Sequence, residues 1–202
     1  TGASRCLTFR WVSDASVTAD GWEASILTGP DAGTNGSIAL CSNSAAVQLF
    51  NSLGGTPDVG GTWTAPGGGA SPGTFTPGTS APGAYTYTVA GTGSCASAAA
   101  VVTVSVSAAP NAGSNGILNI CSNTAAIDLF TVLGGGPNVG GSWTGPGGGV
   151  VSNTFTPGTS PQGTYTYTVA GVPPCTSASA TVQVTQVAAP IAGLSRAITV
   201  CS

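Results

Sequence analysis

Residues able to do acid–base or nucleophilic chemistry are scarce in this sequence. Its 202 residues include six acidic and three basic side chains and no His. General acid–base catalysis needs a positioned His, carboxylate or similar group, and a Ser–His–Asp site needs His. Between residues 32 and 190 the only charges are Asp58 and Asp128, at non-equivalent places in an internal repeat. Neither of the aligned copies, 32–111 and 112–191, therefore holds a carboxylate pair, and the sequence predicts a chain that is not an enzyme.

The low charge also excludes two classes of partner. Charged residues make up 4% of the chain and the net charge is −3, whereas about a quarter of a typical domain is charged. Binding to nucleic acid or to an anionic membrane surface needs clustered Lys and Arg. No run approaches the ~20 apolar residues that a membrane-spanning helix needs. We expect no nucleic-acid partner and no membrane span in this segment.

The sequence contains two copies of an internal repeat, which align without a gap. Residues 32–111 laid over 112–191 are identical at 48 of 80 positions, and Cys201 falls where a third copy would place the counterpart of Cys121. Such a period indicates an array of like units. The predicted domains are 1–30, 31–110, 111–190 and 191–202, the last being the first strand of a third copy. We expect an internal piece of a longer protein, whose other domains are its partners, with the partners of Cys6 and Cys201 outside this chain.

Four cysteines occupy equivalent places in the two copies. The spacing from Cys41 to Cys95 is the same as the spacing from Cys121 to Cys175. The absence of His and of Cys-x-x-Cys spacing argues against a metal site. The sequence predicts one disulfide within each repeat, Cys41–Cys95 and Cys121–Cys175, each stabilising by about 4 kcal/mol. Disulfides in small domains with few large apolar residues indicate an extracellular protein.

The elements around these cysteines are predicted to be short strands. Tyr85, Tyr87 and Val89 alternate with Thr, which is the period of a half-buried strand, and Trp63 lies in another. Asn35-Gly36 predicts a tight turn. About seven strands, a central Trp and regular turn signals indicate an all-β, immunoglobulin-like sandwich. We expect the Trp and Tyr rings in its core; a sugar-binding platform is the alternative.

The N-terminal segment carries a resemblance of its own. Leu7-Thr8-Phe9-Arg10-Trp11-Val12-Ser13-Asp14-Ala15-Ser16 and Gly21-Trp22-Glu23-Ala24-Ser25-Ile26 resemble the last two strands of a CUB domain. The resemblance implies a β-hairpin fragment of a CUB-like jelly roll and a calcium ligand at Asp14. The other two acidic ligands of that family have no counterpart here, and an Asp in a turn also serves as a local hydrogen-bond acceptor. Calcium is the one cofactor that the resemblance suggests.

The repeats themselves resemble a known repeat type. Trp63-Thr64 and Gly83-Ala84-Tyr85-Thr86-Tyr87-Thr88-Val89, between a front and a rear cysteine, are similar to the tandem Ig-like or PKD-like units of large bacterial surface proteins exported by the type IX route. This resemblance implies spacers or adhesive stalks.

Together these features predict a non-catalytic structural or adhesive stalk segment of a secreted, cell-surface bacterial protein or fibre. A surface with so few charges has little electrostatic repulsion between copies. Assembly of the chain into a homo-polymer is therefore compatible with the sequence. The alternative is an accessory or carbohydrate-binding region, with a glycan partner, of a secreted hydrolase whose catalytic domain lies outside this chain. The ligand-binding residues are unknown from the sequence.

Overall fold

The computed structural model describes residues 5–9, 24–93, 95–190 and 193, with side chains described from residue 29 onward. The chain forms two compact units. The first comprises Thr1–Ala109 together with Pro173–Cys175, and the second comprises Pro110–Val172 and Thr176–Ser202. Asp14 and Cys201 lie outside the described residues, so the calcium site and the third copy stay predictions.

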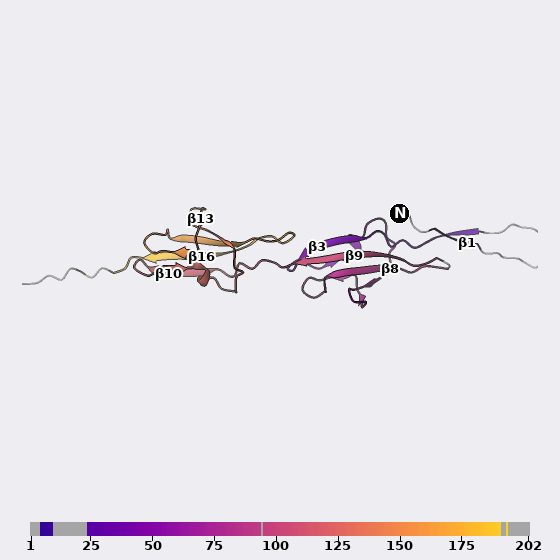
Figure 1. Cartoon of the computed structure of the whole chain (residues 1–202), viewed down its shortest axis with the longest axis horizontal. Coiled ribbons are helices and arrows are strands. Elements are labelled where there is room, and N and C mark those ends of the chain that lie inside the picture. The colour runs from indigo at the N-terminus through magenta and orange to yellow at the C-terminus, as the bar shows by residue number, and fades with distance from the viewer. Residues whose placement is uncertain (1–4, 10–23, 94, 191–192, 194–202) are drawn as a thin grey trace, which may run out of the picture. The chain divides into compact units, whose positions relative to one another are not determined.

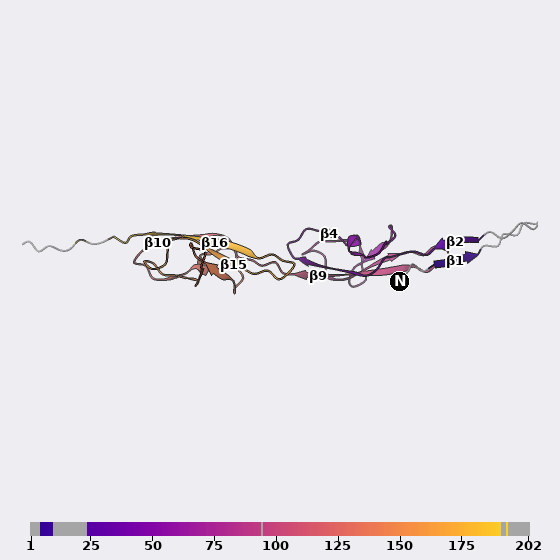
Figure 2. The same ribbon diagram turned by 90° about the horizontal axis from the view of Figure 1, so that it is seen from above.

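Repeat 1 folds into one larger and one smaller sheet (Figures 1 and 2). The larger sheet has the order β3-β9-β8-β5-β6, and the smaller pairs β4 with β7. All pairings are antiparallel except β3 with β9, which is parallel. The elements are β3 (Gly36–Cys41), β4 (Val47–Gln48), the 3₁₀ turn η1 (Leu49–Ser52), β5 (Thr62–Thr64), β6 (Ala70–Ser71), β7 (Thr74–Phe75), β8 (Gly83–Val89) and β9 (Ala98–Ser107).

Repeat 2 has the same topology. Its larger sheet has the order β10-β16-β15-β12-β13, its smaller sheet pairs β11 with β14, and β10 is parallel to β16. The elements are β10 (Gly116–Cys121), β11 (Ile127–Asp128), η2 (Leu129–Val132), β12 (Ser142–Thr144), β13 (Val150–Val151), β14 (Thr154–Phe155), β15 (Gly163–Val169) and β16 (Ala178–Val187). The predicted all-β fold class is confirmed.

Each repeat has its own core. In repeat 1, Tyr85 and Tyr87 of β8 are 3% and 2% exposed, while the Thr residues that follow them are half-buried. Leu49 and Phe75, from η1 and the smaller sheet, are fully buried against them. Trp63 packs on Tyr87 with ring centroids 5.0 Å apart. The prediction that the Trp and Tyr rings form the core is confirmed, and repeat 2 has the equivalent cluster.

A buried tyrosine at the start of the penultimate strand has the geometry of the tyrosine corner of immunoglobulin-like sandwiches. The hydroxyl of Tyr85 donates to the carbonyl of Ala81, at 2.8 Å, and Tyr165 donates to Pro161, at 2.6 Å. Burial raises the pKa of Tyr165 above its ordinary value of 10.0. Both repeats are therefore immunoglobulin-like sandwiches in tandem.

The predicted Asn35-Gly36 tight turn is wrong. Gly36 begins β3, and the side-chain oxygen of Asn35 accepts a hydrogen bond from the backbone N–H of Val101, at 2.8 Å. Asn115 and Thr181 repeat this bond at 2.9 Å. Asn side chains readily substitute for backbone acceptors, so Asn35 extends the parallel β3–β9 pairing by one residue instead of reversing the chain.

The N-terminal segment contains the predicted hairpin. Strand β1 (Arg5–Phe9) pairs antiparallel with β2 (Ala24–Thr28), with Leu7 opposite Ile26 (Figure 2). The sequence pattern placed Trp22 and Glu23 in the second strand as well, and these two residues lie outside the described residues. The relation of this hairpin to CUB domains stays a prediction.

Candidate functional site

Among the described residues, Cys41 and Cys175 form a disulfide. The two Cα atoms are 5.0 Å apart, within the usual range for a disulfide, and the cysteines are 134 residues apart in sequence. Cys41 is the last residue of β3, and Cys175 lies in the loop before β16. The short segment Pro173–Cys175 belongs to the first compact unit.

This pairing corrects the predicted pairs Cys41–Cys95 and Cys121–Cys175, both of which are wrong. Because β3 runs parallel to β9, Cys41 lies opposite Ser107 at the far end of β9. Cys95 precedes Ala98, the first residue of β9. The length of β9, about 30 Å at ~3.3 Å per residue, separates the two ends, whereas bonded cysteines need Cα atoms within ~7 Å.

Two hydrogen bonds of Ser42 hold the Cys41 side of the disulfide in place. The N–H of Ser42 donates to Ser107, at 2.8 Å, and the hydroxyl of Ser42 accepts from the N–H of Ala109, at 2.9 Å. The Sγ of Cys175 lies 3.5 Å from the carbonyl oxygens of Ser107 and Ala108. Both cysteines are buried, at 5% and 6% exposure. The disulfide is therefore enclosed in the first unit.

Cys121 and Cys95 occupy different environments. Cys121 ends β10 as Cys41 ends β3, but it is exposed, and it forms no disulfide within the part of the chain that the structure describes. Cys95 is buried, at 8% exposure, in the loop before β9. Among the described residues no three Cys, Asp or Glu side chains gather where they could hold a metal ion.

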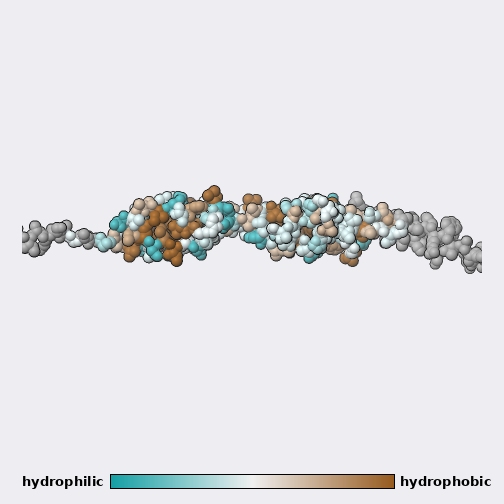
Figure 3. All heavy atoms as spheres, turned by 90° about the horizontal axis from the view of Figure 1, so that it is seen from below, coloured by the Kyte–Doolittle hydropathy of each residue, from teal (hydrophilic) through white to brown (hydrophobic). Residues whose placement is uncertain are grey.

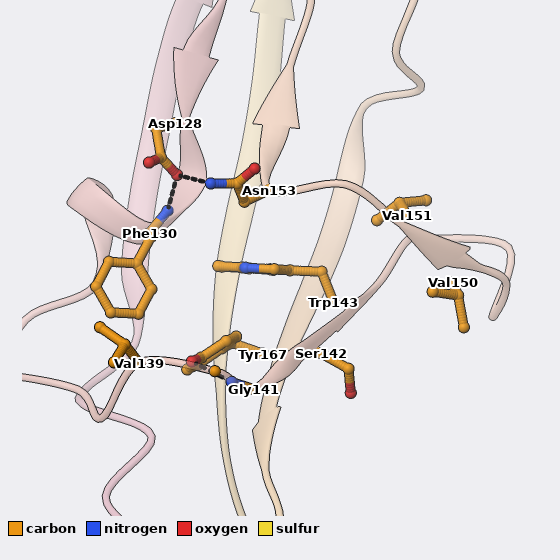
Figure 4. Close-up of a pocket in the computed structure, with 11 residues that line it drawn as sticks. Asp128, Phe130, Val139, Gly141, Ser142, Trp143, Val150, Val151, Asn153 and Tyr167 are labelled. Carbon is orange, nitrogen blue, oxygen red and sulfur yellow. Dashed lines mark hydrogen bonds between the residues drawn. The ribbon is translucent and has the colours of Figure 1, made fainter.

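The second feature is an open pocket of about 410 Å³ in repeat 2 (Figure 4). In Figure 4, Asn153 and Tyr167 lie on either side of the Trp143 ring, and Val150 and Val151 form a wall on β13. The lining residues are Asp128, Phe130, Val139, Gly140, Gly141, Ser142, Trp143, Val150, Val151, Asn153 and Tyr167.

The one carboxylate of this pocket is already engaged. One oxygen of Asp128 accepts from the backbone N–H of Phe130 and from the side-chain amide of Asn153, both at 2.9 Å. The Asp128 side chain therefore caps the N-terminus of the turn η2. The equivalent residue in repeat 1, Gln48, makes no such cap for η1. A single, capping carboxylate can orient a hydrogen-bonding ligand but offers no second group for acid–base work.

Replacing Asp128 by Ala is expected to destabilise repeat 2 by about 1 kcal/mol, because the cap of η2 is lost. The matched control is Gln48→Ala in repeat 1, which removes a side-chain bond to Thr74 but no cap. Native-state hydrogen exchange of the two repeats measures both changes. Equal effects at the two positions would contradict the capping role.

The aromatic rings of the pocket are not a sugar-binding platform. Trp143 and Tyr167 are 4% and 2% exposed and pack on each other with centroids 5.0 Å apart. The Tyr167 hydroxyl accepts from Gly141 N–H, at 2.8 Å, and donates to Asn138, at 2.7 Å. The exposed part of the wall is aliphatic, with Val150 82% exposed.

Exposed apolar side chains are more numerous in repeat 2. On the face drawn in Figure 3, hydrophobic residues gather over the second unit. The large ones that are exposed in repeat 2 are Ile117, Val139, Val150, Val151, Val172 and Val187, against Val59 in repeat 1. The two copies thus share a core but differ at the surface.

No protein-family model and no curated protein matches this chain. Among solved structures, an I-band fragment of titin is 12% identical with a TM-score of 0.47, covering 78% of this chain and 65% of the fragment. The chain thus spans less than two thirds of that fragment. A titin Ig tandem is 14% identical with a TM-score of 0.29, covering 81% of this chain and 100% of the tandem. Within the described residues, no helix has the length and apolarity to cross a membrane.

Proposed function

We propose that this chain is a load-bearing, non-catalytic stalk segment of an extracellular bacterial surface protein or fibre. The observation that carries the proposal is the Cys41–Cys175 disulfide, which joins residues of the two copies and encloses the linker between them in one covalent loop. Immunoglobulin-like units in tandem suit a structural or adhesive module. Its partners are the other domains of the same long chain, or further copies of itself.

The disulfide changes how tension passes along the chain. A pull on the two ends reaches Cys41 from one side and Cys175 from the other, and it crosses between them through the sulfur–sulfur bond. The residues from 42 to 174 lie inside the loop and carry none of that tension. Both cores thus keep most of their strands out of the load path, which is a useful property in a stalk.

The extracellular and non-catalytic parts of the proposal have separate support. A buried disulfide persists in oxidising compartments and is rare in the cytosol. The type IX resemblance of the repeats points the same way. The lack of His in the whole sequence and the single engaged carboxylate of the pocket support a role without catalysis.

Single-molecule stretching between the chain termini tests the load-bearing role. Reduction of the Cys41–Cys175 bond should by itself lengthen the fully unfolded chain by about 450 Å, because this bond keeps a span of 134 residues closed at ~3.3–3.6 Å each. Under the same oxidising conditions, the Cys41→Ala/Cys175→Ala variant should extend that much farther than the unaltered chain. Equal contour lengths before and after reduction would overturn the proposal.

A second candidate is glycan binding at the repeat 2 pocket, which suits an accessory region of a secreted hydrolase. The observation in its favour is the aliphatic wall next to Asp128 and Asn153. The double variant Val150→Ala/Val151→Ser replaces the two valines by the residues that repeat 1 has at the equivalent positions, Ala70 and Ser71. This variant should no longer bind to a glycan array, although it stays folded. An array on which the unaltered chain binds nothing would remove this candidate.

A further inference from the structure

We infer that Cys121 is the attachment site for the rear-cysteine loop of a following copy of this repeat, so that each front cysteine is bonded to the rear cysteine of the next copy. Front cysteines here are Cys41 and Cys121, and rear cysteines are Cys95 and Cys175. The partner is a loop equivalent to residues 172–176. The inference deepens the proposed function and rests on its oxidising compartment.

The backbone around Cys121 matches that around the bonded Cys41. Cys121 lies opposite Val187 in the parallel β10–β16 pair, as Cys41 lies opposite Ser107. The N–H of Ser122 donates to Val187, at 2.9 Å, and the Ser122 hydroxyl accepts from Ala189, at 2.9 Å. These bonds repeat those of Ser42 with Ser107 and Ala109. The second repeat therefore carries the same preformed thiol site.

The two cysteines differ in how far other residues bury them. Cys41 is 5% exposed and bonded to Cys175, whose Sγ contacts the carbonyls of Ser107 and Ala108. Cys121 is exposed, and the equivalent strand end at Val187 is 58% exposed. Val187 replaces the Ser107 of repeat 1, so an apolar side chain lies uncovered beside the thiol. An apolar rear loop such as Val172-Pro173-Pro174 suits that surface.

The direction of strands β10 and β16 determines which cysteine can bond to Cys121. Cys175 precedes β16 at Ala178, whereas Cys121 lies opposite the other end of that strand at Val187. The strand is about 30 Å long between these points at ~3.3 Å per residue, so a bond within the repeat is out of reach. Cys201 has the sequence position of a front cysteine, since it follows Cys121 at the same interval as Cys121 follows Cys41. The cysteine that fits Cys121 is therefore a rear cysteine from the following copy.

Bond formation is an ordinary thiol–disulfide exchange. The Cys121 thiolate attacks the disulfide of an oxidant, either a thiol–disulfide oxidoreductase or oxidised glutathione, and releases one thiol. The rear-cysteine thiolate then displaces the second thiol and leaves the new disulfide. Two protons leave the protein thiols and two electrons reduce the oxidant disulfide to two thiols.

The test extends the whole chain by one completed copy. Residues 123–190 are appended after Ser202, which completes the third copy and supplies a new rear cysteine equivalent to Cys175. After refolding in a glutathione buffer, free thiols are alkylated, and the non-reduced protein is digested and analysed by mass spectrometry. We expect Cys121 joined to the new rear cysteine and Cys201 alkylated. Cys201 joined to the new rear cysteine, or Cys121 alkylated throughout, would overturn the inference.

Two further measurements keep the test decisive if the appended copy folds poorly. In the extended chain, Cys121→Ala should leave the new rear cysteine as a thiol while Cys41–Cys175 stays intact. In the original chain, a synthetic peptide with the sequence of residues 169–179 should form a mixed disulfide with Cys121 in preference to a scrambled peptide. Equal reaction with both peptides contradicts the inference. These outcomes concern bonding alone, so they are separable from the stretching experiment.

Discussion

The double variant Cys41→Ala/Cys175→Ala is expected to lose about 5 kcal/mol of unfolding free energy relative to the oxidised chain. The reason is that the disulfide closes a loop of 134 residues, and the chain-entropy cost that it removes from the unfolded state grows with loop length. Since a domain is stable by only ~5–15 kcal/mol, this is the largest single contribution that we expect. Urea unfolding of the oxidised protein and of the variant measures it.

The control for this prediction is Cys121→Ala, which removes an exposed thiol outside the disulfide. Its unfolding free energy should lie within about 0.5 kcal/mol of the unaltered protein, as surface substitutions usually do. If the double variant also unfolds at the unaltered urea midpoint, the disulfide does not stabilise the chain.

Trp63→Ala is expected to destabilise repeat 1 by about 3–5 kcal/mol and to leave repeat 2 unchanged. The Trp63 ring is 8% exposed, packs on Tyr87, and lies against the backbone at Gly73, where an added Cβ would come within 2.6 Å of the ring. The cavity cannot close easily because both neighbours are fixed in strands or turns. The buried clusters of the two repeats share no residue, so the loss should stay within one of them.

Hydrogen exchange followed by mass spectrometry resolves the two repeats. Protection should fall in β5, β8 and β9 and persist in β12, β15 and β16. The matched control is Val59→Ala, whose side chain is 82% exposed and should change neither repeat. An equal loss of protection in both repeats would show that the cores are not independent.

The strands of each repeat were predictable because their side chains alternate. Tyr85, Tyr87 and Val89 share one face, and Thr86 and Thr88 share the other, so period two gives both the strand and its buried side. Asn35-Gly36 misled the prediction because the Asn-Gly pair is typical of hairpin turns. Only the partner strand β9 reveals that Asn35 takes the place of a backbone acceptor instead.

The disulfide could not be paired from spacing alone. The equal spacing of the cysteines in the two copies makes the pairs within a repeat look natural, but it says nothing of strand direction. The deciding signal was that Cys41 ends the first strand and Cys95 precedes the last. Combined with parallel pairing of those two strands, that placement puts the cysteines at opposite ends of the sheet. Parallel pairing depends on contacts distant in sequence, which local patterns do not encode.

The pocket of repeat 2 was missed for a different reason. In the aligned copies Asp128 stands in place of Gln48, and Asn153 in place of Gly73, at positions 25 residues apart in the sequence. The hydrogen bond between Asp128 and Asn153 joins β11 to the turn before β14 and makes them one feature. Differences between copies of a repeat that cluster in space are the signal that could have found it.

Peptide mapping of the non-reduced protein tests most directly whether a disulfide joins the two copies. Free thiols are alkylated first, so that no exchange occurs during digestion. We predict a linked pair of peptides that contain Cys41 and Cys175, with Cys121 alkylated. Linked pairs Cys41–Cys95 and Cys121–Cys175 would contradict it.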